Sequence, residues 1–202
     1  MLTAPDIRAQ ARQRVRDAML DAAHALVLES GWGSVRMGAI AARVGVSRQT
    51  LHAEFGTKEA LGQALVLRVT DRFLVGVVSA LDARAGHLGD AVSAAVTWAL
   101  EQVQQDALLQ AVLTSTRLGD DQLLPLLTTR GEPLLVRASA ALREWVGAHH
   151  PELDEPVVAD VVDSLVRLVV SHAVLLLDPP AEVGARLGRL AESGLGLARR
   201  RP

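Results

Sequence analysis

Four hydrogen-bonding side chains fall within five consecutive positions: Arg48, Gln49, Thr50 and His52. An arginine can grip a guanine edge or a phosphate through two parallel hydrogen bonds, and a glutamine can pair in the same way with an adenine edge. If one helix carries all four, its exposed face has the chemistry of a DNA-reading surface. For Arg48 the sequence leaves three roles open, namely recognition of a base edge, contact with a phosphate, and simple exposure to solvent.

The residues around this group have the pattern of two short helices joined by a tight turn. Gly45 can adopt the positive φ that ends a helix, and Ser47 is a preferred N-cap for the next one. Apolar residues recur at helical spacing on both sides of this turn: Ile40, Ala41, Val44, Leu51 and Phe55. The arrangement predicts a helix-turn-helix whose second helix enters a DNA major groove.

Composition indicates an all-helical protein. The chain has 202 residues, half of them hydrophobic, with two Phe, three Trp and no Tyr. Scarce aromatic residues beside abundant Ala and Leu argue against β-sheet. The absence of cysteine excludes disulfides and thiol chemistry. Residues 1–60 hold eight Lys and Arg against six Asp and Glu, whereas the remainder holds 13 against 17, so the basic part is N-terminal.

Neither a signal peptide nor a membrane span is expected. Arginines occupy the positions where an apolar leader would lie: Arg8, Arg12, Arg14 and Arg16. They either lie along DNA or are solvated. The most apolar segment, residues 157–177, is interrupted by Asp160, Asp163, Arg167 and His172. We therefore expect a soluble, cytoplasmic protein.

The elements follow from apolar periodicity and from glycine and proline breaks. Residues 1–11 are expected to form a flexible arm, and residues 122–130 are ambiguous. About nine helices are expected, over 12–30, 37–44, 48–54, 57–81, 88–103, 106–117, 132–149, 155–177 and 180–197. This pattern predicts an N-terminal DNA-binding domain over residues 1–60. A long fourth helix joins it to a C-terminal helical bundle, residues 61–202, for ligand binding and dimerisation.

The run from Gly31 to Leu61 resembles the N-terminal domain of TetR/AcrR-type transcriptional regulators. The resemblance is carried by Gly31, Ile40, Ala41, Gly45, Val46, Ser47, Thr50, Leu51, Phe55, Lys58, Glu59 and Leu61. It implies a homodimer that binds a short inverted repeat, usually as a repressor. It also implies that a small molecule in the C-terminal bundle releases the DNA.

The resemblance places DNA-binding residues on the helix-turn-helix and at the start of the fourth helix. The predicted set is Arg36, Ser47, Arg48, Gln49, Thr50, His52 and Lys58. Two of them depart from the family pattern. His52 replaces a tyrosine that tends to touch phosphate, and a histidine could make that contact pH-sensitive. Arg36 replaces a serine or threonine that caps the helix, and an arginine cannot cap in that way, although its guanidinium can clamp a phosphate.

In the C-terminal bundle, polar and aromatic residues on apolar helices are candidates for a ligand pocket. They are Trp98, Gln102, Thr116, Trp145 and His172. The alternative is that both tryptophans fill the core and that His172 is a satisfied buried or interface histidine. Walls of Ala, Val and Leu favour an apolar ligand.

The last two helices are the predicted homodimer interface. Opposite a polar stripe, the penultimate helix carries the apolar residues Val158, Val161, Val162, Leu165, Leu168, Val169 and Leu176. An interface of this kind is isologous, and two-fold symmetry in the protein predicts a palindromic operator.

A second class of function also fits a helical chain, namely a small binding protein or enzyme with a vestigial helix-turn-helix. Against an enzyme, the sequence has no catalytic triad order, no phosphate-cradling glycine loop and no metal-ligand spacing. His149 and His150 are adjacent on a helix and point apart. We therefore predict neither enzymatic activity nor a cofactor or metal. Within the first class, an activator or a regulator that needs no ligand stays open.

Overall fold

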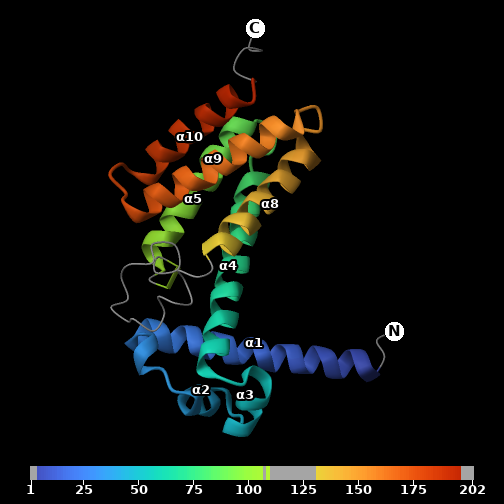
Figure 1. Ribbon diagram of the computed structural model, residues 1–202, viewed down its shortest axis with the longest axis vertical. Helices are drawn as coiled ribbons and strands as arrows, with labels where there is room; N and C mark the ends of the chain where they lie inside the picture. Colours follow the sequence, from blue (N-terminus) through green and yellow to red (C-terminus); the bar gives the residue numbers. More distant parts are fainter. Residues whose placement is uncertain (1–3, 107, 110–130, 197–202) are drawn as a thin grey trace. The chain divides into compact units, whose positions relative to one another are not determined.

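The computed structural model describes residues 4–106, 108–109 and 131–196, and its regular elements are all helices. These residues form eight α-helices and one short 3-10 helix, and the α-helices are labelled in Figure 1. The predicted all-α class is therefore confirmed. The described residues divide into two compact units, one ending at Val69 and the other beginning at Thr70, so the division falls inside α4 (Lys58–Asp82).

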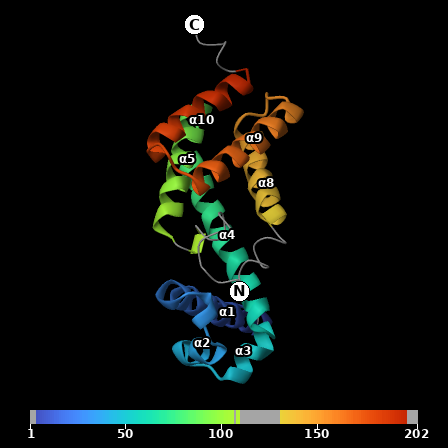
Figure 2. The same ribbon diagram turned by 60° about the vertical axis from the view of Figure 1, so that its left-hand side comes forward.

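The first unit contains the helix-turn-helix. It comprises α1 (Ala4–Ser30), the 3-10 helix η1 (Trp32–Ser34), α2 (Met37–Val44), α3 (Arg48–Phe55) and the first part of α4. α2 and α3 lie together on one side of α1 in both views (Figures 1 and 2). Its core is made by side chains that are almost fully buried: Met19, Ala23, Ile40, Leu51 and Leu61.

The turn between α2 and α3 has the predicted geometry. Gly45 adopts φ 77°, and its N–H is donated to the carbonyls of Ala41 and Ala42, which ends α2. Ser47 Oγ accepts the Thr50 backbone N–H at 3.0 Å and so caps α3. At the next break, Thr57 Oγ1 accepts the Ala60 N–H at 3.1 Å at the start of α4. These local predictions are confirmed.

α1 is longer than predicted. The flexible arm expected over residues 1–11 is wrong for residues 4–11, which are helical, while residues 1–3 lie outside the described part. Residues 6–15 are exposed, so they carry no apolar stripe from which a periodicity argument could start. They are nevertheless rich in Ala, Arg and Gln, which have high helix propensity, and a helix propagates easily from a packed segment.

The second unit is a helical bundle. It contains the second part of α4, α5 (Leu88–Gln105), α8 (Gly131–His149), α9 (Glu155–Val174) and α10 (Pro180–Gly194). α10 runs beside α5, and α8 lies beside α9 (Figures 1 and 2). The α5–α10 contact is close because glycines form it. A side chain at Gly188 would overlap the Gly89 carbonyl oxygen, and one at Gly184 would overlap Thr97 Oγ1.

Helix ends in this unit differ modestly from the predicted ones. α9 ends at Val174 rather than at Leu177, with Leu175 as its C-cap in extended backbone. α10 begins with Pro180 at its first turn, as predicted, and ends at Gly194. The predicted helix over 106–117 and the segment 122–130 lie mostly or wholly outside the described residues. None of the described helices has both the length and the apolarity that crossing a membrane requires.

Candidate nucleic-acid interface and apolar cavity

α3 presents its polar side chains to solvent because its apolar ones anchor the opposite face. Leu51 is fully buried and Phe55 nearly so. Exposed on the remaining faces are Ser47, Arg48, Gln49, Thr50 and His52. The structure therefore brings five of the predicted DNA-binding residues together on one surface. Their contacts with DNA stay a prediction.

The Arg48 side chain reaches from the start of α3 to the first turn of α2. A Cβ atom on Gly38 would lie 2.6 Å from Arg48 Nε, 2.6 Å from Nη2 and 2.8 Å from Cζ. No real side-chain atom tolerates such distances. The guanidinium therefore occupies space that exists only because residue 38 is glycine, a relation that sequence spacing did not suggest.

His52 is tied to the end of its own helix. Its Nδ1 lies 2.7 Å from the Gly56 carbonyl oxygen. Because a carbonyl oxygen only accepts, Nδ1 carries the hydrogen, and Nε2 of the neutral ring then offers a lone pair. In this arrangement Nε2 can donate to a phosphate only when the ring is protonated.

Arg36 and Lys58 converge on the carbonyls of η1. Arg36 Nη1 donates to Gly33 O at 2.7 Å, and Lys58 Nζ donates to Trp32 O at 2.9 Å and to Gly33 O at 3.3 Å. Lys58 Nζ also lies 5.0 Å from the centroid of the Trp32 ring. As expected for an arginine, Arg36 provides no side-chain cap to α2. Two positive charges thus lie close to a helix N-terminus, which favours an approaching anion.

Glu54 of α3 holds two arginines of α1. Its carboxylate lies 2.8 Å from Arg16 Nη1 and 2.9 Å from Arg12 Nη2, and only 15% of its side chain is exposed. Burial acts to raise the pKa of Glu54, but the hydrogen bonds from Arg16 and Arg12 outweigh it, so the pKa lies below its usual range. The Arg16 guanidinium also lies 4.6 Å from the centroid of the Phe55 ring. Two of the N-terminal arginines therefore fix α1 to α3 in this structure.

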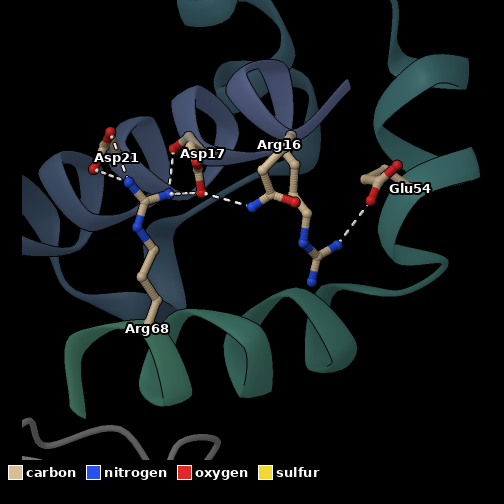
Figure 3. A network of polar contacts seen from close by, with 6 residues as sticks. Arg16, Asp17, Asp21, Glu54 and Arg68 are labelled. Atoms are coloured by element: carbon tan, nitrogen blue, oxygen red, sulfur yellow. Dashed lines mark hydrogen bonds and ion pairs between the residues drawn. The ribbon is translucent and has the colours of Figure 1, made fainter. Parts of the chain in front are cut away.

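Arg68 of α4 is bound to α1 by two carboxylates (Figure 3). Its Nη1 donates to the Asp17 backbone carbonyl at 2.6 Å and to Asp17 Oδ1 at 3.1 Å, and its Nη2 lies 3.0 Å from both oxygens of Asp21. The Arg68 side chain is 15% exposed. Charge-assisted bonds of this kind are stronger than neutral ones, so the part of α4 that belongs to the first unit is held firmly on α1. No motif or residue spacing in the sequence indicates this cluster.

The second unit contains a cavity whose described lining is hydrocarbon apart from one indole. All 24 lining residues within the described part of the chain are Ala, Val, Leu, Phe or Trp, and they come mainly from α4, α5, α8 and α9. The single polar atom on their side chains is Trp145 Nε1, which donates to Asp82 Oδ1 at 2.7 Å. A molecule in this cavity would therefore meet apolar walls with no hydrogen-bonding side-chain group left over among the described lining residues.

The predicted ligand-binding residues are distributed differently. Trp145 lines the cavity, whereas Trp98, Gln102 and His172 are not among its described lining residues. Trp98 packs on Gly76 of α4, and its ring centroid lies 5.6 Å from that of Phe73. Thr116 lies outside the described residues.

The apolar face of α9 is used within the subunit. Val158, Val162 and Leu165 are buried in the core of the second unit instead of forming a free surface. Exposed apolar side chains nevertheless remain on α9 and α10: Val157 (39% exposed), Leu168 (36%), Val174 (50%) and Leu190 (47%). A run of apolar residues on one helix could not show which of them face the core of the same subunit.

Both units match models of known protein families. Residues 19–65 match a family described as "Bacterial regulatory proteins, tetR family". Residues 87–193 match one described as "Bacterial Tetracyclin repressor, C-terminal domain". The two matches cover the helix-turn-helix and most of the bundle that holds the cavity.

Individual relatives agree with these matches. The HTH-type transcriptional regulator AlkX of Mycobacterium tuberculosis is 32% identical over 185 residues, covering 89% of this chain and 84% of AlkX. The structure of the TetR family repressor AlkX from Dietzia sp. strain DQ12-45-1b, implicated in biodegradation of n-alkanes, has a TM-score of 0.71 and 26% identity. It covers 89% of this chain and 96% of that protein. The fatty acid degradation regulator FadR from Bacillus halodurans shares the fold, with a TM-score of 0.51, 20% identity, and coverage of 89% and 98%.

Proposed function

This chain belongs to the TetR family of bacterial transcriptional regulators, and we propose that it is a repressor released from DNA by a small apolar molecule. It is a helix-turn-helix DNA-binding regulator and not an enzyme. The observation that carries the proposal is the presence in one chain of an exposed polar α3 and a hydrocarbon-lined cavity. We place it in the cytoplasm, where a regulator of transcription meets its DNA.

Operator binding is assigned to the first unit. α3 enters the major groove with Arg48, Gln49, Thr50 and His52 facing the DNA, and Ser47 lies at the groove edge. Arg36 and Lys58 lie near the start of α2, which supports contact with a phosphate there. This assignment extends the family's operator binding to particular residues of this chain.

The effector is a molecule with a long hydrocarbon part. Burying a polar group without a hydrogen-bond partner is costly, and the described cavity lining provides no free partner. A hydrocarbon loses nothing in such a site and gains the burial of its surface. The name of the Dietzia AlkX, a repressor implicated in n-alkane biodegradation, supports both the sign of regulation and the class of effector.

Dimerisation is assigned to α9 and α10. Large apolar side chains are left exposed on these helices, and a two-fold pairing would cover them: Val157, Leu168, Val174 and Leu190. A dimer with two copies of α3 reads a palindromic operator. In this assignment residues 1–60 bind DNA, and residues 61–202 bind the effector and the second copy.

Release follows from differential binding. An effector can shift the protein away from its DNA-compatible arrangement only if it binds the incompatible arrangement more tightly. α4 is placed to carry that difference, because Arg68 near its middle is bound to α1 while Phe73, Val77 and Leu81 further along the same helix line the cavity.

Selection from a pool of randomised DNA duplexes tests the proposal. The full-length protein should enrich an inverted repeat, and its binding should weaken steeply as salt rises. Addition of decane or dodecane should then release the selected duplex. Failure to enrich any duplex would contradict operator binding, whereas binding that decane and dodecane leave unchanged would contradict the proposed effector class.

A further inference from the structure

The space that Arg48 occupies is created by Gly38. Gly38 lies in the first turn of α2, where glycine is a poorer helix former than almost any other residue. Arg48 Nε and Nη2 lie 2.6 Å from the point where a Cβ on Gly38 would be. The absence of a side chain at this position therefore gives the guanidinium a place against α2.

The place of the Arg48 guanidinium against α2 determines which part of the DNA it contacts. In a helix-turn-helix, the first helix crosses the sugar-phosphate backbone while the second lies in the groove. A guanidinium that extended straight from α3 would reach base edges. The Arg48 guanidinium instead lies on α2, the helix that faces the backbone.

We infer that Arg48, held by Gly38, is a phosphate contact and that base recognition at the start of α3 falls to Gln49. This inference rests on the proposed operator binding and assigns the roles within it. Arg48 provides affinity that is equal for all DNA sequences, because every phosphate is alike. Gly38 is a positioning residue, since it touches Arg48 and not the DNA.

Gln49 differs from its neighbour in its surroundings. Its side chain is exposed and takes part in no side-chain hydrogen bond among the described residues. A glutamine amide can pair with N6 and N7 of adenine in the major groove. Gln49 is therefore available for base readout at the position next to an arginine that is already held elsewhere.

The test measures binding of the full-length protein to two duplexes of equal length, one enriched by selection and one of random sequence, over a series of salt concentrations. Arg48→Ala should weaken both by the same factor and lower the slope of log Kobs against log salt by about 0.9 for each bound subunit. Gln49→Ala should leave the slope unchanged. It should reduce the preference for the selected duplex by roughly tenfold or more.

Gly38→Ala tests the positioning role. The atoms that a methyl group displaces are the end of a flexible side chain, so the protein should fold normally and bind both duplexes more weakly. In an Arg48→Ala background, Gly38→Ala should change nothing further. Gly147→Ala is the matched control, because a Cβ on that α8 glycine meets no atom within 4 Å, and it should leave DNA binding unchanged.

Three results would overturn the inference. One is a loss in Arg48→Ala that is at least tenfold larger on the selected duplex than on the random one. Another is an effect of Gly38→Ala that persists without Arg48, and the third is unchanged DNA binding by Gly38→Ala. If the native protein showed no salt-sensitive DNA binding at all, the proposed function itself would fail. That outcome is seen with the native protein alone, whereas the three results above concern the variants of a protein that does bind DNA.

Discussion

The two units of this chain are stabilised by different kinds of contact. In the first unit, arginines and carboxylates join helices that lie far apart in sequence, as Arg68 joins Asp17 and Asp21 and as Arg16 joins Glu54. In the second unit, α5 and α10 approach through Gly184 and Gly188, and the interior is hydrocarbon around a cavity. Its Arg137–Asp71 pair, which joins α8 to α4, lies exposed at the surface. Directional charged bonds respond to salt and pH, whereas apolar packing responds to volume.

This difference fits the tasks proposed for the two units, namely DNA binding and binding of a hydrocarbon. A unit that approaches a polyanion needs its basic side chains fixed in direction, and acidic partners within the unit provide that. A unit that admits a hydrocarbon needs apolar walls with space between them, and empty space forfeits dispersion contacts that a ligand can restore. The following perturbations should therefore affect one unit and spare the other.

The largest effect is expected from Gly188→Leu in the second unit. The new side chain would overlap the Gly89 backbone carbonyl, so α5 and α10 must separate. The free energy of unfolding should fall by about 3 kcal/mol, at the upper end for overpacked sites. Thermal unfolding followed by circular dichroism measures the loss. Gly147→Ala is the control and should show no such loss, because its new methyl group meets no neighbouring atom. An unchanged midpoint of unfolding for Gly188→Leu would contradict the close approach of α5 and α10.

Filling the cavity should abolish the response to hydrocarbon. Ala138 of α8 lines the cavity, and Ala138→Phe would place an aromatic ring within it. For the native protein, an alkane at about 100 times its Kd should stabilise the fold by about 2.7 kcal/mol, and Ala138→Phe should lose that gain. Thermal shift with dodecane measures both. Ala140→Phe is the matched control, since Ala140 is exposed on the same helix, and equal shifts in both variants would place the ligand elsewhere.

A smaller effect is expected from Arg68→Ala in the first unit. The substitution removes charge-assisted bonds to Asp17 and Asp21, and we expect a cost of about 1–2 kcal/mol because both carboxylates stay partly solvated. The cost should shrink in high salt. Chemical denaturation at two salt concentrations measures it. Arg167→Ala breaks an exposed pair with Asp163 that solvent screens, so it should cost much less than Arg68→Ala. Equal costs for the two variants would contradict a special role for Arg68.

The smallest effect is expected from Glu54→Gln, and it concerns how stability depends on pH. The pKa of Glu54 lies below its ordinary value of 4.5, so its pairing with Arg16 and Arg12 stabilises the fold above that pH. The contribution is lost as the pH falls below 4.5 and through the folded-state pKa. Glu54→Gln should therefore unfold more easily than the native protein at neutral pH, and the difference should narrow in acid. A difference that stays constant from pH 7 to pH 3 would show that the charge of Glu54 is not responsible.

Local rules accounted for the helix-turn-helix. Gly45 and Ser47 fulfil their roles through backbone conformation and one hydrogen bond, and Leu51 and Phe55 through the helical period. Such features involve residues within a few positions of each other. They could be predicted because the sequence places the partners side by side, and the same holds for Thr57 at the start of α4.

Contacts between residues far apart in the sequence could not be predicted from local spacing. Nothing in the sequence connects Gly38 with Arg48, Gly76 with Trp98, or Lys58 with the carbonyls of η1. Each contact needs the helices to be placed first. Trp98 resembled a pocket residue because it interrupts an apolar helix, yet the missing side chain of Gly76 gives its ring a place in the packing.

The Trp145–Asp82 hydrogen bond also gives the protein an internal optical reporter. The chain has three tryptophans and no tyrosine, so its ultraviolet emission arises from indole alone. Trp145 forms part of the cavity wall, and its ring stacks on His149 with centroids 4.4 Å apart. A hydrocarbon arriving at that wall changes the polarity around this indole. Binding can therefore be followed as a change in the emission wavelength of the unlabelled protein, over the emission of Trp32 and Trp98.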